Sequence, residues 1–482
     1  MTSTLKFRYQ RLSAHYIDAI QNNVLLPGDA LPSLRKLMQV HDVSLSTASE
    51  ACRSLESQGW VEARARSGFF VRHRARIETT LREPDSLQKP DTAQFIGIHS
   101  KISEFHVKKQ RSPITINLAG ARAEASLYPS DALQKAAIRC LRRHKAILTT
   151  MGHHTGSRHF KAALTKRAFQ QGLIFAPDDL IITRGASEGV MLALRAVAKS
   201  GDTIAVESPA YYGLLQMLES LGLRALEIPT SPTSGMLPRA LEQALRTHAG
   251  VKAVVVVPHL QNPTGAIMPA AHQLDLLEIC KTLGVVVIED AVYTDLIETD
   301  ACQHTIKSLD QDGNVIFCAS FTKVLAPGLR IGWMHPGKWQ ARIDMLKQAQ
   351  LQEADEWPQL ALAEIIGTGI FDRHLKRLRN QLNKQRQQYA ASIICNFPAG
   401  TRLGLATGGT LLWVELPPKC SSWEIFEKAL REKIAVAPGA IFSNSKQFDR
   451  FLRINCGAAF SKEIEIAIRR LGDIVKQSIT QT

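Results

Sequence analysis

The sequence predicts two folds in tandem, a small α+β unit of helices and a hairpin followed by a large, mostly parallel α/β domain. The chain has 482 residues, which is too long for one ordinary hydrophobic core. Residues 1–76 show helical spacing interrupted by turns, whereas beyond Pro113 short runs rich in Val and Ile alternate with helical stretches. Hydrophobic residues make up 45% of the chain, which is enough to bury two such cores.

The charge and the cysteine pattern bear on partners and compartment. A formal net charge of +15 favours a polyanionic partner such as nucleic acid, although it says nothing about the fold. The eight cysteines are scattered without a C-x-x-C pair, as is typical of reduced proteins. Neither a secretory signal, a transit peptide nor a membrane-spanning run is indicated. We therefore expect a cytoplasmic protein that does not contact a membrane.

The small unit has the layout of a DNA-binding module. Apolar residues recur at helical spacing from Tyr9 to Ile20, and the helix should end near Asn22. Ser33 and Ser44 are placed to cap two further helices, one ending at His41 and the other passing through Leu55. Two extended runs, residues 60–63 and 69–72, follow as a hairpin. This order predicts a winged helix-turn-helix, whose second short helix enters the major groove.

Short motifs in this unit carry a family resemblance. They are Leu26-Pro27-Gly28-Asp29-Ala30-Leu31-Pro32-Ser33-Leu34-Arg35, Val43-Ser44, Leu55-Glu56-Ser57-Gln58-Gly59-Trp60 and Ser67-Gly68-Phe69-Phe70-Val71. Together they resemble the GntR family. The resemblance implies that the residues approaching DNA are Ser33, Arg35, Ser44, Ser46, Thr47 and Gly68.

Basic residues of the wing suit contacts with phosphate. They are Arg64, Arg66, Arg72, Arg74 and Arg76. The alternative is a solvated basic edge that leads into a linker. The chain also departs from the family, because Leu45 and Ser49 stand where many relatives have arginines in the recognition helix. A bidentate arginine on guanine is therefore missing there, and the operator sequence is not predictable.

The composition sets three predicted segments. Residues 1–76 form the DNA-binding domain, and residues 77–112 form a polar linker with a short helix near Ile102 to Lys109. Residues 113–482 form the α/β domain, with a large lobe over about 113–366 and a small lobe over about 367–482. A linker is favoured over a separate subdomain because it has so little apolar surface to bury.

Ligand sites in open α/β sheets gather where strands end, so we consider the residues that follow each predicted strand. The strands are Leu180–Thr183, Thr203–Glu207, Ala253–Val257, Val285–Asp290 and Val315–Ser320. The segments that follow or overlap their ends are Arg184–Gly189, Glu207–Tyr211, Pro258–Gly265, Glu289–Tyr293, Ser320–Lys323 and Pro327–Trp333. In this order they resemble the fold-type I aminotransferases, over roughly residues 115–475. Joined to the GntR-type head, the chain is similar to the MocR family of regulators.

The aminotransferase resemblance implies pyridoxal 5'-phosphate and a role for several residues. Lys323 would hold the cofactor covalently, and Asp290 would keep its ring nitrogen protonated. Tyr293 and Asn262 would hydrogen-bond the ring oxygen, and Tyr211 would stack on the ring. The alternatives are a surface lysine, a helix-capping aspartate and a core tyrosine.

The same resemblance implies which residues bind the cofactor phosphate and which bind the carboxylate of the effector. For the phosphate the residues are Gly185, Ala186, Ser187, Ser320 and Arg330. Arg453, in an apolar strand, would clamp the carboxylate of an amino acid; the alternative is a salt bridge to a protein carboxylate.

One departure concerns the segment upstream of Gly156, where many aminotransferases place a tyrosine that reaches the cofactor of the neighbouring subunit. This chain has Met151 there, followed by Gly152-His153-His154. The two histidines lack a third ligand nearby, so we predict a polar loop and no metal site.

Three functions compete. The first is a regulator that uses the site to sense an amino acid, an amine or vitamin B6. The second is an active aminotransferase with a DNA-binding appendage, and the third is a DNA-binding protein whose enzyme-like domain is only a dimerisation scaffold. The first is favoured because an operator-binding head has no catalytic use, and the third is weakest because a scaffold has no use for these site residues together. The expected partners are double-stranded DNA, a small effector and a second copy of the chain.

Overall fold

The computed structural model describes residues 8–21, 24–57, 60–64, 67–71, 77–85, 93–95, 97–298, 304–351 and 355–480. They fall into two compact units. One unit comprises Met1–Glu78, Gln387–Thr401 and Phe460–Thr482, and the other comprises Thr79–Arg386 and Arg402–Ala459. Among the described residues, no helix is long and apolar enough to cross a membrane.

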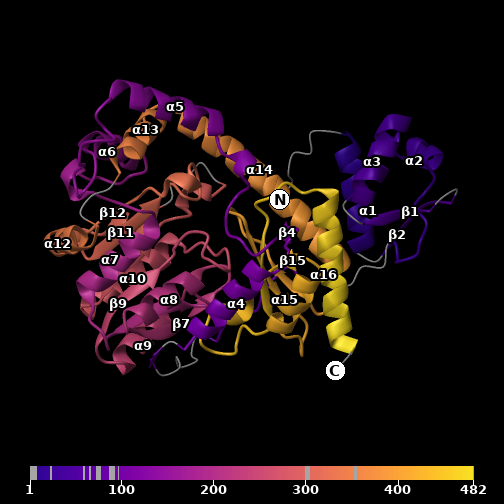
Figure 1. The fold of residues 1–482 in the computed structure, drawn as a ribbon. Coiled ribbons are helices and arrows are strands. Elements are labelled where there is room, and N and C mark those ends of the chain that lie inside the picture. The colour runs from indigo at the N-terminus through magenta and orange to yellow at the C-terminus, as the bar shows by residue number, and fades with distance from the viewer. Residues whose placement is uncertain are drawn as a thin grey trace. The chain divides into compact units, whose positions relative to one another are not determined.

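The N-terminal elements confirm the winged helix-turn-helix (Figure 1). They are α1 (Arg8–Gln21), α2 (Leu34–His41), α3 (Leu45–Ser57), β1 (Val61–Arg64) and β2 (Gly68–Val71). Ser33 and Ser44 cap α2 and α3 as expected, because their hydroxyls accept hydrogen bonds from Lys36 N at 3.3 Å and Thr47 N at 3.2 Å. Side chains from every element meet in one small core, which includes Leu12, Tyr16, Leu37, Ala48, Leu55, Val61 and Val71.

The segment after the wing buries more apolar surface than its composition predicts. It contains β3 (Gln94–Phe95) and α4 (His99–Arg111), a helix longer than the expected one. Ile102 and Phe105 are 0% and 1% exposed, because α4 packs on the α/β domain. The ring of Phe105 lies 5.2 Å from that of Phe426. Leu81 also lies against this domain, since a Cβ at Gly404 would come within 2.8 Å of its Cδ1.

A nine-stranded mixed sheet forms the centre of the large lobe, with the order β3-β7-β6-β9-β10-β11-β12-β5 and β8 paired to β7. Its strands are β5 (Ile181–Thr183), β6 (Thr203–Ser208), β7 (Arg224–Ser231), β8 (Gly235–Met236), β9 (Val251–Val256), β10 (Val286–Asp290), β11 (Val315–Ser320) and β12 (Gly332–His335). The pairs between β7 and β11 along this order are parallel, whereas β12 is antiparallel to both of its neighbours. Because helices cover both faces of this sheet, the side chains on both faces of its central strands are buried, which explains why these strands are rich in Val and Ile.

The helices of this lobe are α5 (Ser130–Arg143), α6 (Arg158–Gln170), α7 (Ala186–Val197), α8 (Tyr212–Ser220), α9 (Pro238–Thr247), α10 (Ala270–Thr282), α11 (Ile306–Leu309), α12 (Gln340–Leu351) and α13 (Glu356–Ile366). The remaining elements are β4 (Ile116–Asn117), α14 (Gly369–Asn396), β13 (Arg402–Gly404), β14 (Leu411–Glu415), α15 (Ser422–Arg431), β15 (Ile434–Ala435), β16 (Ala437–Pro438), β17 (Phe451–Asn455) and α16 (Lys462–Thr480). Strands β13, β14, β17 and β16 form a second, antiparallel sheet in that order.

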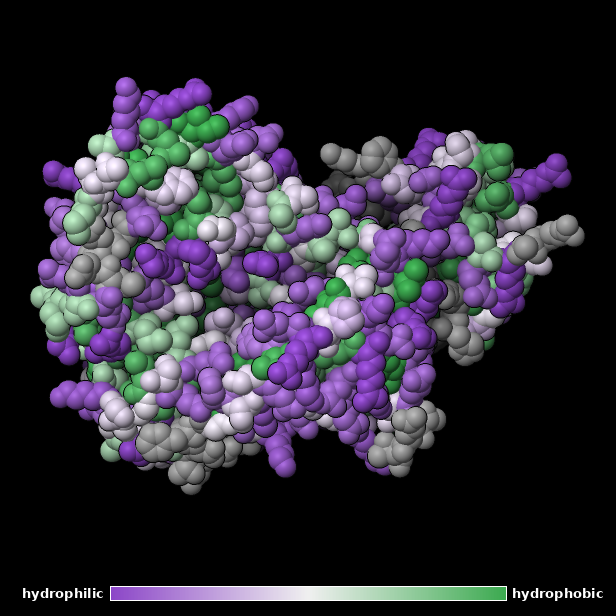
Figure 2. Space-filling view, in the orientation of Figure 1, coloured by the Kyte–Doolittle hydropathy of each residue, from purple (hydrophilic) through white to green (hydrophobic). Residues whose placement is uncertain are grey.

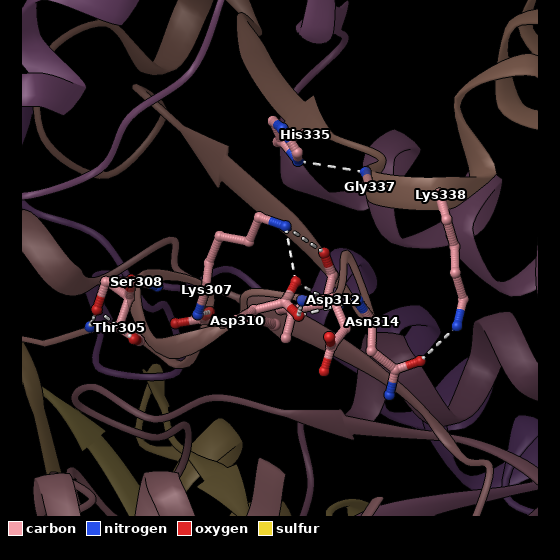
Figure 3. Close-up of polar contacts among 11 residues, drawn as sticks. Thr305, Lys307, Ser308, Asp310, Asp312, Asn314, His335, Gly337 and Lys338 are labelled. Carbon is pink, nitrogen blue, oxygen red and sulfur yellow. Dashed lines mark hydrogen bonds and ion pairs between the residues drawn. The ribbon is translucent and has the colours of Figure 1, made fainter. Parts of the chain in front are cut away.

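A buried polar cluster fixes the start of β11, at the end of the strand away from Ser320 (Figure 3). Lys307 Nζ lies 2.8 Å from Asp310 Oδ2, and both side chains are nearly inaccessible to solvent. Asp310 also accepts hydrogen bonds from the backbone of Val315 and Asn314, at 2.9 Å each. Burial would raise the pKa of Asp310, but the bond from Lys307 and these backbone bonds together hold it below the ordinary value. This network is satisfied within the protein, and it lies far along the strand from the residues described next.

Candidate functional site

Four neighbouring parallel strands of the large sheet, which Figure 1 shows as a whole, end next to the predicted site residues. Tyr211 follows β6, Asn262 follows β9, Tyr293 follows β10 and Lys323 follows β11, and Asp290 is the last residue of β10. Because parallel strands end at the same edge, side chains that are far apart in the sequence become neighbours there. The sheet topology, rather than any local motif, assembles the site.

Lys323 is half-buried and points toward a segment from before the first helix of the lobe. Its Nζ donates a hydrogen bond of 2.7 Å to Ala121 O and lies 5.5 Å from the centroid of the Tyr293 ring. Burial, followed by the charge of Arg453, lowers the pKa of Lys323 to about 8, while Asp290 acts in the opposite direction. A lysine with this pKa supplies more of the neutral, nucleophilic amine near neutral pH than an ordinary lysine does.

Asp290 lies at the end of β10, where its Oδ1 accepts a hydrogen bond of 3.2 Å from Val292 N. Burial raises its pKa to about 6, and the bond from Val292 and the charge of Lys323 limit the rise. The carboxyl is therefore mostly ionised at pH 7. An ionised carboxylate at this position can accept a hydrogen bond from a ring nitrogen and so keep that nitrogen protonated.

Asn262 connects the two ends of the site. Its Nδ2 donates a hydrogen bond of 3.4 Å to the hydroxyl of Tyr293, and its Oδ1 accepts one of 2.8 Å from Arg453 Nη1. Both Asn262 and Tyr293 are buried, and burial raises the pKa of Tyr293 well above its ordinary range. The phenol stays protonated and acts as a hydrogen-bond donor at neutral pH.

Arg453 is 1% exposed, on β17 between Trp413 of β14 and Ala437 of β16. Its Nη2 donates hydrogen bonds of 2.7 and 3.1 Å to Ala119 O and Gly120 O, whereas its buried Nε has no partner among the described residues. In the same described part of the chain, no carboxylate lies within ion-pair distance of this guanidinium. The alternative of a structural salt bridge is not what the structure shows, and a buried guanidinium without a protein carboxylate suits a carboxylate ligand.

Residues 119–122, which we call the carbonyl strap, were missed by sequence reasoning. Carbonyl oxygens of this segment accept hydrogen bonds from both Arg453 and Lys323. The strap is held in turn by Asn455, whose Nδ2 donates a bond of 3.0 Å to Arg122 O. The only signal in the sequence was Gly120 in an apolar run, which is too common to indicate a site.

The predicted phosphate residues lie around the N-terminus of α7. Gly185 precedes the helix with φ +76°, and a Cβ there would approach Arg330 Nη2 to 3.0 Å. Ser320 Oγ lies 2.8 Å from Thr322 Oγ1, a hydroxyl that the sequence analysis did not select. The free N–H groups of Ala186 and Ser187, with the cation of Arg330, form a place for an anion.

Tyr211 stands directly before α8, and its ring centroid lies 5.0 Å from that of Tyr212. Burial raises its pKa to about 12. Gly213, also missed, is needed there because a Cβ on it would come within 2.5 Å of the Tyr211 ring. With an imine-forming lysine, a carboxylate for a ring nitrogen, an aromatic face and an anion cradle, the residues fit pyridoxal phosphate.

The expected loop at Met151 is present, and the His153 and His154 rings stack at 4.5 Å. His153 Nδ1 lies 2.9 Å from Thr155 Oγ1. Within the described ranges, no group of three or more potential metal ligands occurs.

Behind the site, Glu207 carries a buried carboxyl one residue before the end of β6. Its Oε2 accepts hydrogen bonds of 3.3 Å from Val257 N and from Gln261 Nε2, and its buried Oε1 has no partner among the described residues. Burial raises its pKa to about 8. The folded chain therefore holds this proton more tightly than the unfolded chain, so the stability that Glu207 contributes falls as pH rises from about 4.5 to about 8.

Glu207→Gln should therefore stabilise the protein at pH 8, on the order of 3 kcal/mol, and have little effect at pH 5. Denaturant unfolding of the cofactor-free protein at both pH values measures the difference. Glu242→Gln, on the exposed face of α9, is the control and should not change the pH dependence. An identical pH dependence for Glu207→Gln and the parent would contradict the assigned protonation.

The candidate DNA-binding side chains lie on two helices and the wing. Arg35 is exposed on α2, and no ion pair of Arg35 occurs among the described residues. Ser44, Ser46 and Thr47 form a cluster at the start of α3, since Ser44 Oγ lies 2.9 Å from the hydroxyls of the other two. Gly68 opens β2 with φ +98°.

The wing shows one feature that the sequence did not indicate. The guanidinium of Arg64 lies 2.9 Å from Glu62 and 4.4 Å above the Phe70 ring, so its charge is partly compensated. Four of the predicted wing arginines, Arg66, Arg72, Arg74 and Arg76, lie outside the described residues.

Comparisons with known proteins agree with this architecture. The model of the bacterial regulatory proteins of the gntR family matches residues 8–71, and that of the aminotransferase class I and II family matches residues 120–471. The uncharacterized HTH-type transcriptional regulator YjiR of Escherichia coli is 33% identical over 475 residues, which cover 98% of this chain and 99% of the relative. The 2-aminoadipate transaminase of Thermus thermophilus is 27% identical and covers 77% of this chain and 92% of its own.

A solved structure supports the same division. The kynurenine aminotransferase of Pyrococcus horikoshii superposes with a TM-score of 0.73 at 26% identity, over 79% of this chain and 95% of its own. The regulator YjiR thus matches this chain over nearly its whole length, whereas the aminotransferases match about four fifths of it. The chain belongs to the MocR-type regulators, in which a GntR-family DNA-binding head is joined to a domain of the aminotransferase class I and II family.

Proposed function

We propose that this regulator senses an amino acid, an amine or a vitamin B6 compound at the site around Lys323, and that the bound effector changes its affinity for DNA. The observation that carries the proposal is the buried guanidinium of Arg453, which donates to backbone carbonyls and an amide, leaves its Nε without a partner among the described residues, and has no protein carboxylate within ion-pair distance there. Such a site is useful to a regulator because the presence or absence of an exchangeable ligand can shift the protein between two states that differ in their affinity for DNA.

The cofactor of this site is pyridoxal phosphate, which supplies an electrophilic carbon for amine exchange and an electron-withdrawing ring. Lys323 holds it, and the Asp290 carboxylate keeps a proton on the ring nitrogen. Tyr293 donates a hydrogen bond from its protonated phenol, and Asn262 positions that phenol. Arg453 orients the carboxylate of the effector after its bonds to the carbonyl strap are exchanged.

The proposed division of labour assigns DNA binding to residues 1–76 and cofactor binding to residues 113–482, with the two lobes meeting near residue 366. Residues 77–112 connect the two parts, and within them β3 and α4 pack on the α/β domain. The regulator acts in the cytoplasm, where its operator lies.

The regulator works as a homodimer that bridges two half-sites, since fold-type I sites form between subunits and a two-fold axis presents two heads. A hollow of about 700 Å³ beside the site supports this arrangement, because it is lined largely by apolar residues of α5, α13 and the loop after Lys323. Figure 2 shows hydrophobic residues gathered over the region of α5 and α13. Tyr128 joins the hollow to the site, since its hydroxyl donates a hydrogen bond of 3.3 Å to Lys323 O.

A footprint on the DNA upstream of the protein's own gene tests the proposal. The cofactor-loaded chain should protect two half-sites, and one class of amino acid or amine should change the protection. Protection that responds to no effector, combined with rapid turnover of an amino acid with a 2-oxo acid, would replace sensing by the second candidate, an active aminotransferase. That candidate is favoured by the complete set of Lys323, Asp290, Tyr293 and Arg453, and by the relatives named as transaminases.

Arg35 should contact a DNA phosphate, because it is an exposed cation at the start of the helix-turn-helix. Arg35→Ala should weaken binding to all sequences alike and reduce the slope of log affinity against log salt by about one unit. Binding isotherms at several salt concentrations measure both effects. Arg239→Ala, an exposed arginine on α9, is the matched control and should leave the slope unchanged. A parental slope in Arg35→Ala would remove this residue from the interface.

A further inference from the structure

A buried ion pair lies at the first turn of α7, the helix whose N-terminus forms the candidate phosphate cradle. Lys347 of α12 reaches this turn, and its Nζ lies 2.9 Å from Glu188 Oε1. The two side chains are 1% and 11% exposed, and α12 packs against α7. Because water and salt screen buried charges much less than surface charges, this pair contributes to the electrostatic potential at the cradle.

Glu188 is bonded to the loop that leads into the helix. Its Oε2 accepts a hydrogen bond of 2.5 Å from Arg184 N, directly before Gly185. The Thr183 hydroxyl donates a bond of 2.9 Å to Gly185 O. These two bonds fix the backbone around Gly185, which lies against the guanidinium of Arg330. The carboxylate therefore helps to hold the cradle in shape, and the first N–H groups of α7 are left to bind a ligand.

The charge of Glu188 conflicts with this positioning role. A phosphate at the N-terminus of α7 carries negative charge, and Glu188 lies in the first turn of the same helix. An unpaired carboxylate there would repel the phosphate, although its oxygen is a suitable acceptor for Arg184 N. Lys347 resolves the conflict, because it pairs with Oε1 while Oε2 holds the loop.

We propose that Lys347 sets the affinity of the site for the phosphate of its cofactor by neutralising Glu188. Lys347 is a positioning residue, since it acts through Glu188 and needs no contact with the cofactor. The inference concerns cofactor binding and does not rest on the sensing function. It predicts effects of opposite sign for the two residues. Without Lys347 the phosphate meets an unpaired carboxylate, whereas without the charge of Glu188 it meets an additional cation.

Absorbance titration of the cofactor-free full-length chain tests this inference. The ligands are pyridoxal 5'-phosphate and pyridoxal, which lacks the phosphate. Lys347→Met should weaken binding of the phosphorylated ligand at least about tenfold, because the lost cation acts on a charged group, and should leave the affinity for pyridoxal unchanged. Glu188→Gln keeps an acceptor for Arg184 N and should bind the phosphorylated ligand at least as tightly as the parent does.

The double variant Glu188→Gln/Lys347→Met replaces the ion pair by two neutral side chains, a change that proteins tolerate better than the loss of one partner. Its affinity for the phosphorylated ligand should lie within about threefold of the parental value, since the two opposite effects cancel. It should also bind this ligand more weakly than Glu188→Gln does. The last comparison decides the matter if Lys347→Met alone does not fold, and equal affinities of these two variants would overturn the inference.

Lys307→Met is the matched control, because Lys307 is a buried lysine whose Nζ lies 2.8 Å from Asp310 Oδ2, at the end of β11 away from Ser320. It should leave the ratio of the two affinities at the parental value. A parental ratio in folded Lys347→Met would overturn the inference. Equal weakening of both ligands by Lys347→Met, or weaker binding of the phosphorylated ligand by Glu188→Gln, would overturn it as well, by showing that the pair only supports the loop.

Discussion

Lys323→Ala is expected to abolish both covalent attachment of the cofactor and the response of DNA binding to the effector. Lys323 is the lysine that the strand ends place beside Asp290 and Tyr293, and its lowered pKa favours imine formation. The variant should lose the visible absorbance that borohydride traps as a stable adduct. Its free energy of unfolding should change by less than about 1 kcal/mol, since only the bond from Nζ to Ala121 O is lost.

DNA affinity without effector should survive in this variant, because the head has a core of its own. Lys199→Ala, at an exposed lysine of the α/β domain, is the control for a lost positive charge. Both variants are compared by absorbance, borohydride trapping and DNA titration with and without effector. An effector response of parental size in Lys323→Ala would show that covalent attachment is not the switch.

Arg453→Lys is expected to weaken binding of amino acids by at least about 30-fold, because lysine keeps the charge but lacks the planar fork that binds a carboxylate through two hydrogen bonds. The shorter reach also breaks the bonds to Asn262 and the carbonyl strap. Calorimetric titration of the cofactor-loaded protein with L-alanine measures the loss.

Ethylamine, which resembles alanine without its carboxylate, provides the matched ligand control. Its affinity should be nearly the same for the parent and for Arg453→Lys. An equal loss for both ligands would mean that Arg453 supports the fold of the site and does not bind the carboxylate.

The sequence predicted the fold and most of the site because the informative residues follow strands in a fixed order. Periodicity located β6, β9, β10 and β11, and the rule that ligands gather at strand ends pointed to the segments that follow them. The resemblance of those segments to aminotransferases then assigned roles to Asn262, Asp290, Tyr293 and Lys323. The capping serines of the head were predictable for a similar reason, since Ser33 and Ser44 act on residues three positions away.

What the sequence could not predict depends on contacts between distant segments. The carbonyl strap acts through backbone oxygens, which every residue has, so its composition carries no signal. Helix α4 was expected to be short and loosely packed. It is neither, because Ile102 and Phe105 are covered by apolar side chains from elements more than 100 residues later, which the local sequence does not reveal. The contact of Arg64 with the Phe70 ring depends on the register of a hairpin, which the sequence did not give.

The two bonds of Asn262 also fix the direction in which hydrogen atoms point across the site. Its amide oxygen must face Arg453, because a guanidinium has only donors, and its amino group is thereby turned toward the oxygen of Tyr293. The phenolic oxygen is then an acceptor on that side, and its own hydrogen is left to donate elsewhere; in the proposed site it would point toward the ring oxygen of the cofactor. Arginine, amide and phenol thus form a one-way relay of donors. An inverted amide would leave two donors facing each other at Arg453 and would turn the Tyr293 hydrogen back toward the amide oxygen. Asn262→Asp would keep the acceptor for Arg453 but reverse the polarity at Tyr293, so a one-atom change at the middle of the relay would reorient the hydroxyl at its end.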